Sequence, residues 1–123
     1  MKQSTMEQLI FSYAYYIIAD FDKFMAFFKT LHENGLFTID KSSSDKKMLS
    51  GAFIRPYPKN HWSPFAKSSA GRQVIGHMSA KDGNLKLETM TKSGLKEARQ
   101  LLESALGEAI LFDREEYRDP LGR

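Results

Sequence analysis

The stretch QVIGHMSAKDGNLKLETMT, residues 73–91, gives the clearest indication of fold in this chain. Apolar and polar residues alternate on both sides of Asp82-Gly83, as they do in half-buried strands. An Asp-Gly pair between two such runs is typical of a two-residue hairpin turn, because both positions tolerate a positive φ. We therefore predict two antiparallel strands, Gln73–Ala80 and Leu85–Thr91.

The two-residue turn also predicts which residues face each other, since a slip of one residue would move every side chain to the opposite face. On the inner face we expect the pairs Ala80 with Leu85, Met78 with Leu87 and Val74 with Thr91, with Gly76 and Thr89 between them. On the outer face we expect Ser79 with Lys86, His77 with Glu88, and Ile75 with Met90.

The first apolar run, Leu9–Ala19, is rich in aromatic and β-branched residues and is predicted to be a buried strand. One long helix over Met6–Asn34 is the alternative, because several apolar residues in the run also recur at helical spacing. Asp20 favours the strand, since it is a good N-cap for a separate helix. That helix would cover Phe21–Asn34 and end at Gly35.

Upstream of the hairpin, Leu36–Asp40 and Met48–Arg55 are predicted strands, separated by the Ser- and Lys-rich loop Lys41–Lys47. Downstream of it, Ser93 is a suitable N-cap for a second helix, which Gly107 would end. The residues spaced for the buried face of this helix are Leu95, Ala98, Leu101, Leu102, Ala105 and Leu106.

The C-terminal residues add a short final strand, Ala109–Phe112, and a charged, flexible tail. We therefore expect a single α+β domain over residues 1–113 and a tail over 114–123. The order β-α-β-β-β-β-α-β predicts a two-layer sandwich, with two helices on one face of a mainly antiparallel sheet. This order is related to that of a ferredoxin-like sandwich, an architecture that hosts many unrelated functions.

Composition excludes several classes of protein. The chain has no cysteine, so it cannot form disulfides, thiolate metal sites or a thiol nucleophile, which agrees with the reducing cytoplasm. The apolar run after Met6 is broken at Asp20 and Asp22 and is too short to span a membrane. We expect a cytoplasmic protein that does not bind membranes.

Positive charge is concentrated in the middle of the chain. Residues 41–72 contain seven Lys or Arg residues against one Asp, whereas the whole chain has a net charge of +3. Three prolines break any regular ladder over Pro56–Gly71, so a long loop is expected there. The candidate partner-binding residues are Arg55, Tyr57, Lys59, His61, Trp62, Phe65, Lys67 and Arg72.

This mixture of cations and aromatic residues suits two kinds of partner. Trp, Tyr and Arg are enriched among the anchors of protein interfaces, so the first expectation is a protein with an acidic surface, as for an inhibitor or regulatory module. Cations that neutralise phosphates and rings that stack on unpaired bases also suit single-stranded or structured nucleic acid, which is the alternative. A small enzyme of unknown reaction is the third choice.

No other pattern indicates catalysis, a metal or a cofactor. His32, His61 and His77 do not stand at a metal-ligand spacing, and no nucleophile, base and orienting group are brought together by sequence alone. Thr91-Lys92-Ser93-Gly94 would place hydroxyls and amides at a helix N-terminus, where an anion can bind. This segment lacks the full phosphate-loop pattern, so helix capping is its simpler role.

Overall fold

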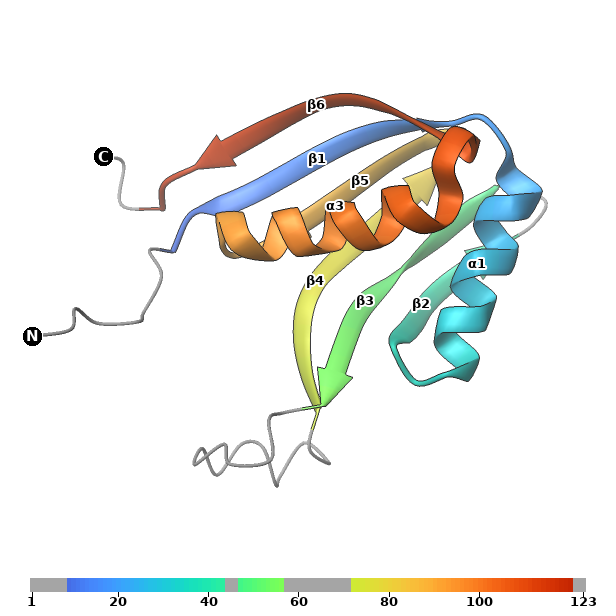
Figure 1. Cartoon of the computed structure of the whole chain (residues 1–123), viewed down its shortest axis with the longest axis horizontal. Coiled ribbons are helices and arrows are strands. Elements are labelled where there is room, and N and C mark those ends of the chain that lie inside the picture. The colour runs from blue at the N-terminus through green and yellow to red at the C-terminus, as the bar shows by residue number, and fades with distance from the viewer. Residues whose placement is uncertain (1–8, 44–46, 57–71, 121–123) are drawn as a thin grey trace, which may run out of the picture.

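The computed structural model describes residues 9–43, 47–56 and 72–120 (Figure 1). Its elements are β1 (Phe11–Ile18), α1 (Phe21–Glu33), β2 (Phe37–Ser43), β3 (Met48–Pro56), β4 (Arg72–Lys81), β5 (Asn84–Thr89), α3 (Lys92–Leu106), a 3₁₀ turn (Gly107–Ala109) and β6 (Ile110–Arg118). The predicted order of strands and helices is confirmed.

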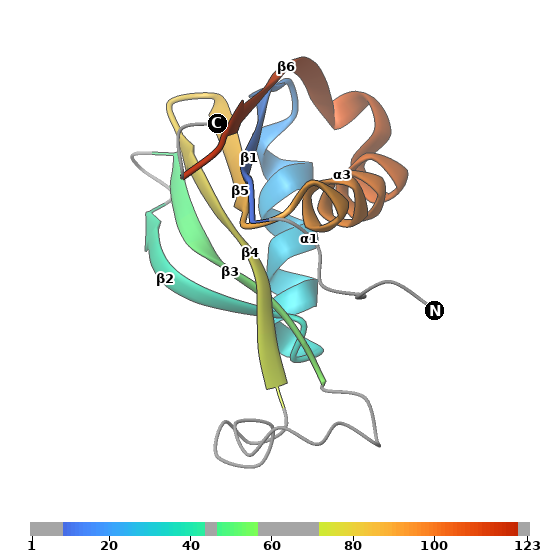
Figure 2. The ribbon, with the colours of Figure 1, turned by 90° about the vertical axis from the view of Figure 1, so that its left-hand side faces the viewer.

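The six strands form one antiparallel sheet in the order β2-β3-β4-β5-β1-β6. Both helices lie on the same face of this sheet, as the view along the sheet shows (Figure 2). The predicted two-layer α+β sandwich is therefore confirmed, and its core fills the space between the sheet and the two helices.

Asp20 separates β1 from α1 as the sequence predicts. Its backbone is extended, with φ −130° and ψ 94°, and its carboxylate accepts a hydrogen bond of 3.1 Å from the amide of Lys23. This bond satisfies one of the amides that have no partner in the first turn of a helix. The alternative of one long helix over Met6–Asn34 is wrong, because residues 11–18 pair with strands on both sides.

Phenylalanine rings join α1 to the strands beneath it. The ring of Phe28 lies 4.8 Å from that of Phe37 and 5.8 Å from that of Phe53, centroid to centroid. The strands approach closely here, since a Cβ on Gly51 would lie 2.0 Å from the carbonyl oxygen of Thr38. Glycine at position 51 therefore allows β2 and β3 to pair under the aromatic cluster.

The predicted register of the β4–β5 hairpin is confirmed near the turn. Met78 faces Leu87 inside, where both are buried, and His77 faces Glu88 on the outer face. Asp82 and Gly83 have φ values of 53° and 85°, as the turn requires.

The part of the predicted hairpin farthest from the turn is wrong. Pairing between β4 and β5 ends at His77 and Glu88, so the expected pairs Val74 with Thr91 and Ile75 with Met90 do not form. The reason is that Thr91, not Ser93, caps α3: its hydroxyl accepts a hydrogen bond of 3.0 Å from the amide of Gly94. A chain that must start a helix at Lys92 cannot continue beside β4.

Two further expectations are corrected by α3 and β6. Leu101 and Ala105 are exposed, because the helix buries only the narrower stripe of Leu95, Ala98, Leu102 and Leu106. The last strand continues to Arg118, so residues 114–118 belong to the sheet rather than to a tail. Asp113 has no partner in β1 and forms a bulge, after which pairing resumes between Arg114 and Tyr15.

Candidate functional site

The predicted partner-binding loop lies mostly outside the described residues. This applies to Tyr57, Lys59, His61, Trp62, Phe65 and Lys67. The two ends of the loop are described as backbone: Arg55 lies opposite Gln73, and Pro56 lies opposite Arg72. Pro56 and Arg72 therefore lie together at one end of the paired strands β3 and β4, which we call the far end of the β3–β4 hairpin (Figure 1).

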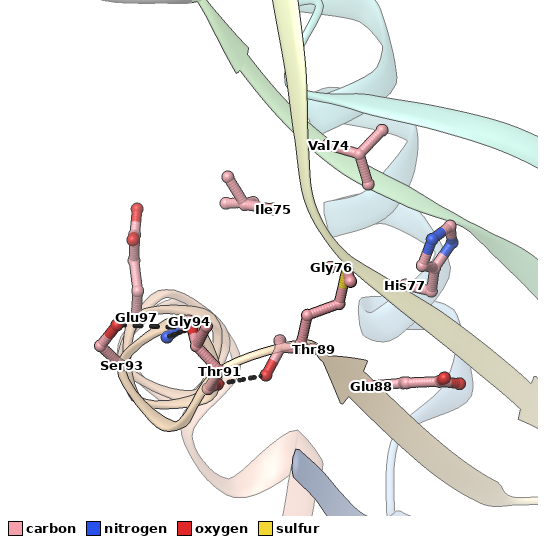
Figure 3. Close-up of a pocket in the computed structure, with 11 residues that line it drawn as sticks. Val74, Ile75, Gly76, His77, Glu88, Thr89, Thr91, Ser93, Gly94 and Glu97 are labelled. Atoms are coloured by element: carbon pink, nitrogen blue, oxygen red, sulfur yellow. Dashed lines mark hydrogen bonds between the residues drawn. The ribbon is translucent and has the colours of Figure 1, made fainter. Parts of the chain in front are cut away.

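A pocket of about 420 Å³ lies beside this end of the hairpin. β4 contributes Val74, Ile75, Gly76 and His77, the end of β5 contributes Glu88 and Thr89, and the start of α3 contributes Ser93, Gly94 and Glu97, with Met90 and Thr91 between β5 and α3. Figure 3 shows β4 along one side of the pocket and the first turn of α3 on the other. We call this site the β4–α3 pocket.

The pocket exists because β5 leaves β4 too early to complete the hairpin. The amide of Ile10 donates a hydrogen bond of 3.0 Å to the carbonyl of Met90, which directs Met90 towards β1. The hydroxyl of Thr89 donates to the carbonyl of Thr91 at 2.7 Å and holds the turn into α3. These bonds move the chain away from β4 and leave the space open.

One edge of β4 has no neighbouring strand along this space. Within β4, only His77–Lys81 pair with β5, so Arg72–Gly76 is paired with β3 alone. The carbonyl oxygen of Ile75 lies 3.7 Å from the position of a Cβ built on Gly94. The first turn of α3 therefore lies close to this backbone acceptor of β4.

Two apolar side chains at the pocket are largely exposed. Val74 is 56% exposed and Met90 is 60% exposed, although the hairpin prediction placed Val74 on the inner face. Both contribute to the lining, together with the partly buried Ile75. An apolar surface beside an unpaired strand edge is typical of a site where another chain docks.

The charge of the pocket differs from that of the predicted loop. Glu88 and Glu97 supply two carboxylates, and none of the described lining residues is a Lys or Arg. His77 lies opposite Glu88, which confirms the predicted cross-strand pair. The pocket therefore favours a cation and disfavours a phosphate.

A second group of polar residues joins α3 to the sheet. Arg99 donates to Glu103 at 2.8 Å, to Glu115 at 2.5 Å and to the Tyr16 hydroxyl at 3.0 Å. Tyr16 in turn donates to Glu103, and Tyr117 donates to Glu115. These bonds connect β1, α3 and β6, so the group has a structural role.

Burial and hydrogen bonding shift the proton affinities in this group. Burial, together with the hydrogen bond to Glu103, raises the pKa of Tyr16 and keeps its hydroxyl protonated. The hydrogen bond from Tyr117, with a further contribution from Arg99, lowers the pKa of Glu115. Tyr16 thus stays neutral and Glu115 stays charged. In these protonation states both side chains can accept the hydrogen bonds that Arg99 donates.

The sheet face without helices carries tyrosines in contact with cations. The ammonium group of Lys86 lies 4.9 Å from the ring centroid of Tyr13, and the guanidinium of Arg114 lies 4.1 Å from that of Tyr15. Arg114 also pairs with Glu116 at 3.2 Å. Such contacts between neighbouring strands stabilise a sheet. Here the two cations lie over the two tyrosine rings.

Sequence reasoning missed the β4–α3 pocket because it placed Thr91 in a strand. A usable signal was present, since Thr91 stands three residues before Gly94 and can cap its amide. A cap at Thr91 requires β5 to end before it. Choosing that cap would have left Val74 and Ile75 without partners and predicted an opening beside β4.

Other kinds of site find no support in the described residues. No group of three or more His, Asp or Glu residues stands close enough to hold a metal ion there. The Nδ1 atom of His32 lies 3.1 Å from the carbonyl oxygen of Phe37, at the end of α1. None of the helices in the described ranges is long and apolar enough to cross a membrane.

No family model, curated protein or solved structure matches the chain. The function must therefore be argued from the pocket, the strand edge and the segment that adjoins them.

Proposed function

We propose that this chain is a non-catalytic binding domain that docks on another protein at the far end of the β3–β4 hairpin. The docking surface combines the β4–α3 pocket with the adjoining segment 55–72. The observation that carries the proposal is the pair of exposed apolar side chains, Val74 and Met90, beside the unpaired edge of β4. Exposed apolar surface of this kind is stabilised when a partner covers it.

The adjoining segment supports the same location. Val74 stands two residues after Arg72, which pairs with Pro56 at the other end of the segment. Trp62 and Tyr57 belong to the residue types that most often anchor protein interfaces. We propose that the cations of this segment, which include Lys59 and Lys67, meet an acidic part of the partner while the pocket takes an apolar part.

The charge of the pocket favours a protein over nucleic acid. A nucleic acid lying on segment 55–72 and reaching the pocket would bring phosphates towards Glu88 and Glu97. Like charges at short range raise the free energy of such a complex. We also propose a cytoplasmic location, with which the absence of cysteine is compatible.

The proposal is tested by crosslinking in cells of the native host. A photoreactive amino acid at Met90 should crosslink a defined protein partner, because the docked partner covers that side chain. The same group at Leu111, which is 53% exposed on β6, is the matched control. Crosslinking to RNA or DNA, or equal capture at both positions, would contradict the proposal.

A pair of variants tests the same surface by affinity for the crosslinked partner. Val74→Ser with Met90→Ser should weaken binding by about 1–3 kcal/mol, as loss of interface anchors does. Ile17→Ser with Leu111→Ser removes similarly exposed apolar groups elsewhere and should change the affinity by less than about 0.5 kcal/mol. Both pairs must show the far-UV circular dichroism of the unchanged protein.

A further inference from the structure

We infer that the helix-free face of the sheet binds a single-stranded nucleic acid around Tyr13 and Tyr15 of β1. Within the described residues both helices cover the opposite face (Figure 2). Bases would stack on the two tyrosine rings, and phosphates would contact Lys and Arg side chains on the surrounding strands. This site goes beyond the proposed function, because it is a second surface with a different class of ligand.

The tyrosines of β1 point to the helix-free face. Ala14 and Tyr16 are buried beneath the helices, whereas Tyr13 and Tyr15 are only half-buried. Side chains alternate in direction along a strand, so both half-buried rings lie on the other side of the sheet, roughly 7 Å apart. Because β1 lies between β5 and β6, the two rings have a strand on each side from which cations can reach a bound ligand.

A row of residues without a carboxylate crosses the whole sheet at Tyr15. In order from β2 to β6, the paired residues of this row are Lys41, Ser50, Ser79, Lys86, Tyr15 and Arg114. We call it the Tyr15 row. It spans six strands, a width of roughly 24 Å, and carries a cation at each end and a third near the middle. Cations spread in this way complement a chain of phosphates.

The carboxylates on this face lie in the next row, beside Tyr13. Glu88 and Glu116 are the residues that pair with Tyr13 on its two sides. Arg114 forms ion pairs with Glu116 at 3.2 Å and with Asp113 at 2.7 Å, yet its side chain is still 52% exposed. Because like charges repel, phosphates are expected along the Tyr15 row and not beside Tyr13.

The cations of the site are already held against its rings. The ammonium group of Lys86 lies 4.9 Å from the ring centroid of Tyr13, and the guanidinium of Arg114 lies 4.1 Å from that of Tyr15. An exposed contact between a cation and a ring is weaker than stacking of a base on that ring. A bound base therefore replaces the cation on the ring, and the released cation lies next to the phosphates of the same strand.

The shape of the face favours a single strand over other polyanions. Bases inside a duplex stack on one another, so they cannot lie on the tyrosine rings. An acidic protein segment would use the cations but would have no bases to stack on the rings. Dependence on the rings therefore separates a single-stranded nucleic acid from both alternatives.

The first experiment measures binding by fluorescence anisotropy, with the full chain and labelled RNA and DNA single strands of about 12 nucleotides. At least one of the two strands should bind at least about tenfold more tightly than the duplex of the same sequence. The RNA and DNA arms show which of the two nucleic acids the site prefers. No binding of either strand, or equal affinity for the duplex, would overturn the inference.

Stacking is tested with two pairs of variants at the same positions. Tyr13→Leu/Tyr15→Leu keeps apolar side chains on the strand but removes the rings, and should weaken binding at least about tenfold. Tyr13→Phe/Tyr15→Phe keeps the rings and should bind within about threefold of the unchanged protein. Equal losses in the two pairs, or no loss in the Leu pair, would overturn stacking.

A measurement on the unchanged protein covers the case in which the Leu pair does not fold. Amide NMR shifts caused by the added strand should be largest at Ser79, Lys86 and Tyr15, which lie in the Tyr15 row. Shifts that are largest on α1 or α3 would place the nucleic acid on the other face and overturn the inference.

The phosphate contacts are tested by the dependence of affinity on salt. Lys86→Gln/Arg114→Gln should make the slope of log affinity against log salt less steep by about 1.4, which is about 0.7 for each lost phosphate contact. Lys29→Gln/Lys96→Gln removes the same charge from exposed positions on α1 and α3 and should change the slope by less than about 0.3. Equal changes would mean attraction by overall charge alone and would overturn the site.

Two further results separate this site from an acidic protein and from the proposed function. Polyglutamate should displace the labelled strand at least about tenfold less well than the unlabelled strand does. Equal displacement would make an acidic protein the occupant and overturn the inference. Val74→Ser/Met90→Ser, at the β4–α3 pocket, should bind the strand within about threefold of full affinity. A larger loss there, with none in Tyr13→Leu/Tyr15→Leu, would overturn both this site and the proposed function.

Discussion

Replacing Leu87 with Ala tests the register on which the sheet is built. Leu87 is fully buried in β5, between Ala14 on β1 and Met78 on β4, which are also buried. The backbone around it is held by ladders on both sides, so the cavity left by the smaller side chain cannot close easily. We expect a loss of about 3–5 kcal/mol, the upper part of the range for Leu→Ala in cores.

The measurement is urea unfolding followed by far-UV circular dichroism. Leu111→Ala is the control, because it makes the same substitution at a β6 position that is 53% exposed. It should change the free energy of unfolding by about 0.5 kcal/mol or less. The dependence of this free energy on urea should be the same in all three proteins, so that a change in midpoint reports stability.

A loss of less than about 1 kcal/mol for Leu87→Ala would refute the reasoning. The same holds if the losses in the two variants are equal. Either result would mean that Leu87 does not occupy the inner face, and that the turn at Asp82-Gly83 does not set the pairing of β4 with β5.

Two further predictions concern the start of α1 and the contacts of β6. Asp20→Ala should reduce the free energy of unfolding by about 0.5–2 kcal/mol, because the bond to the Lys23 amide is lost, and urea unfolding measures this loss. The folded-state pKa of Glu115 lies below the ordinary value of 4.5, so its contribution to stability is present above that pH and is lost as the pH falls. Glu115→Gln should therefore lower stability near neutral pH and weaken the decline seen on acidification.

Each of these predictions has a control. Asp20→Ser keeps a capping oxygen and should retain most of the stability that Asp20→Ala loses. Glu108→Gln, in the 3₁₀ turn before β6, changes one exposed carboxylate in the same way and should leave the acid response close to that of the unchanged protein. If Asp20→Ser is as damaging as Asp20→Ala, or if both Gln variants respond alike to acid, the corresponding contact does not stabilise the fold.

Local signals were sufficient for most elements of this fold. The alternation around Asp82-Gly83 predicted the hairpin, and Asp20 placed the boundary between β1 and α1. Gly107, with φ 51°, ended α3 where expected. Each signal acts over a few residues, through turn geometry or capping, so it can be read without knowing what lies across the core.

The extent of strand pairing could not be predicted in this way. Residues 114–118 are mostly charged, yet they form part of β6, because β1 offers an unpaired edge and Arg99 holds Glu115. The charged side chains remain largely at the surface while their backbone completes the sheet. A sequence shows the polarity of such a segment but not the strand edge that is available to it.

The candidate site shows most clearly which features local sequence decides and which depend on tertiary packing. The sequence by itself determined the turn, the facing of Met78 and Leu87, and the cationic, aromatic composition of segment 55–72. Only the tertiary structure decided where β5 leaves β4. At Thr91 a strand position and a helix cap exclude each other, and the packing of α3 and the bond from Ile10 to Met90 select the cap. The open edge of β4 is the consequence of that choice.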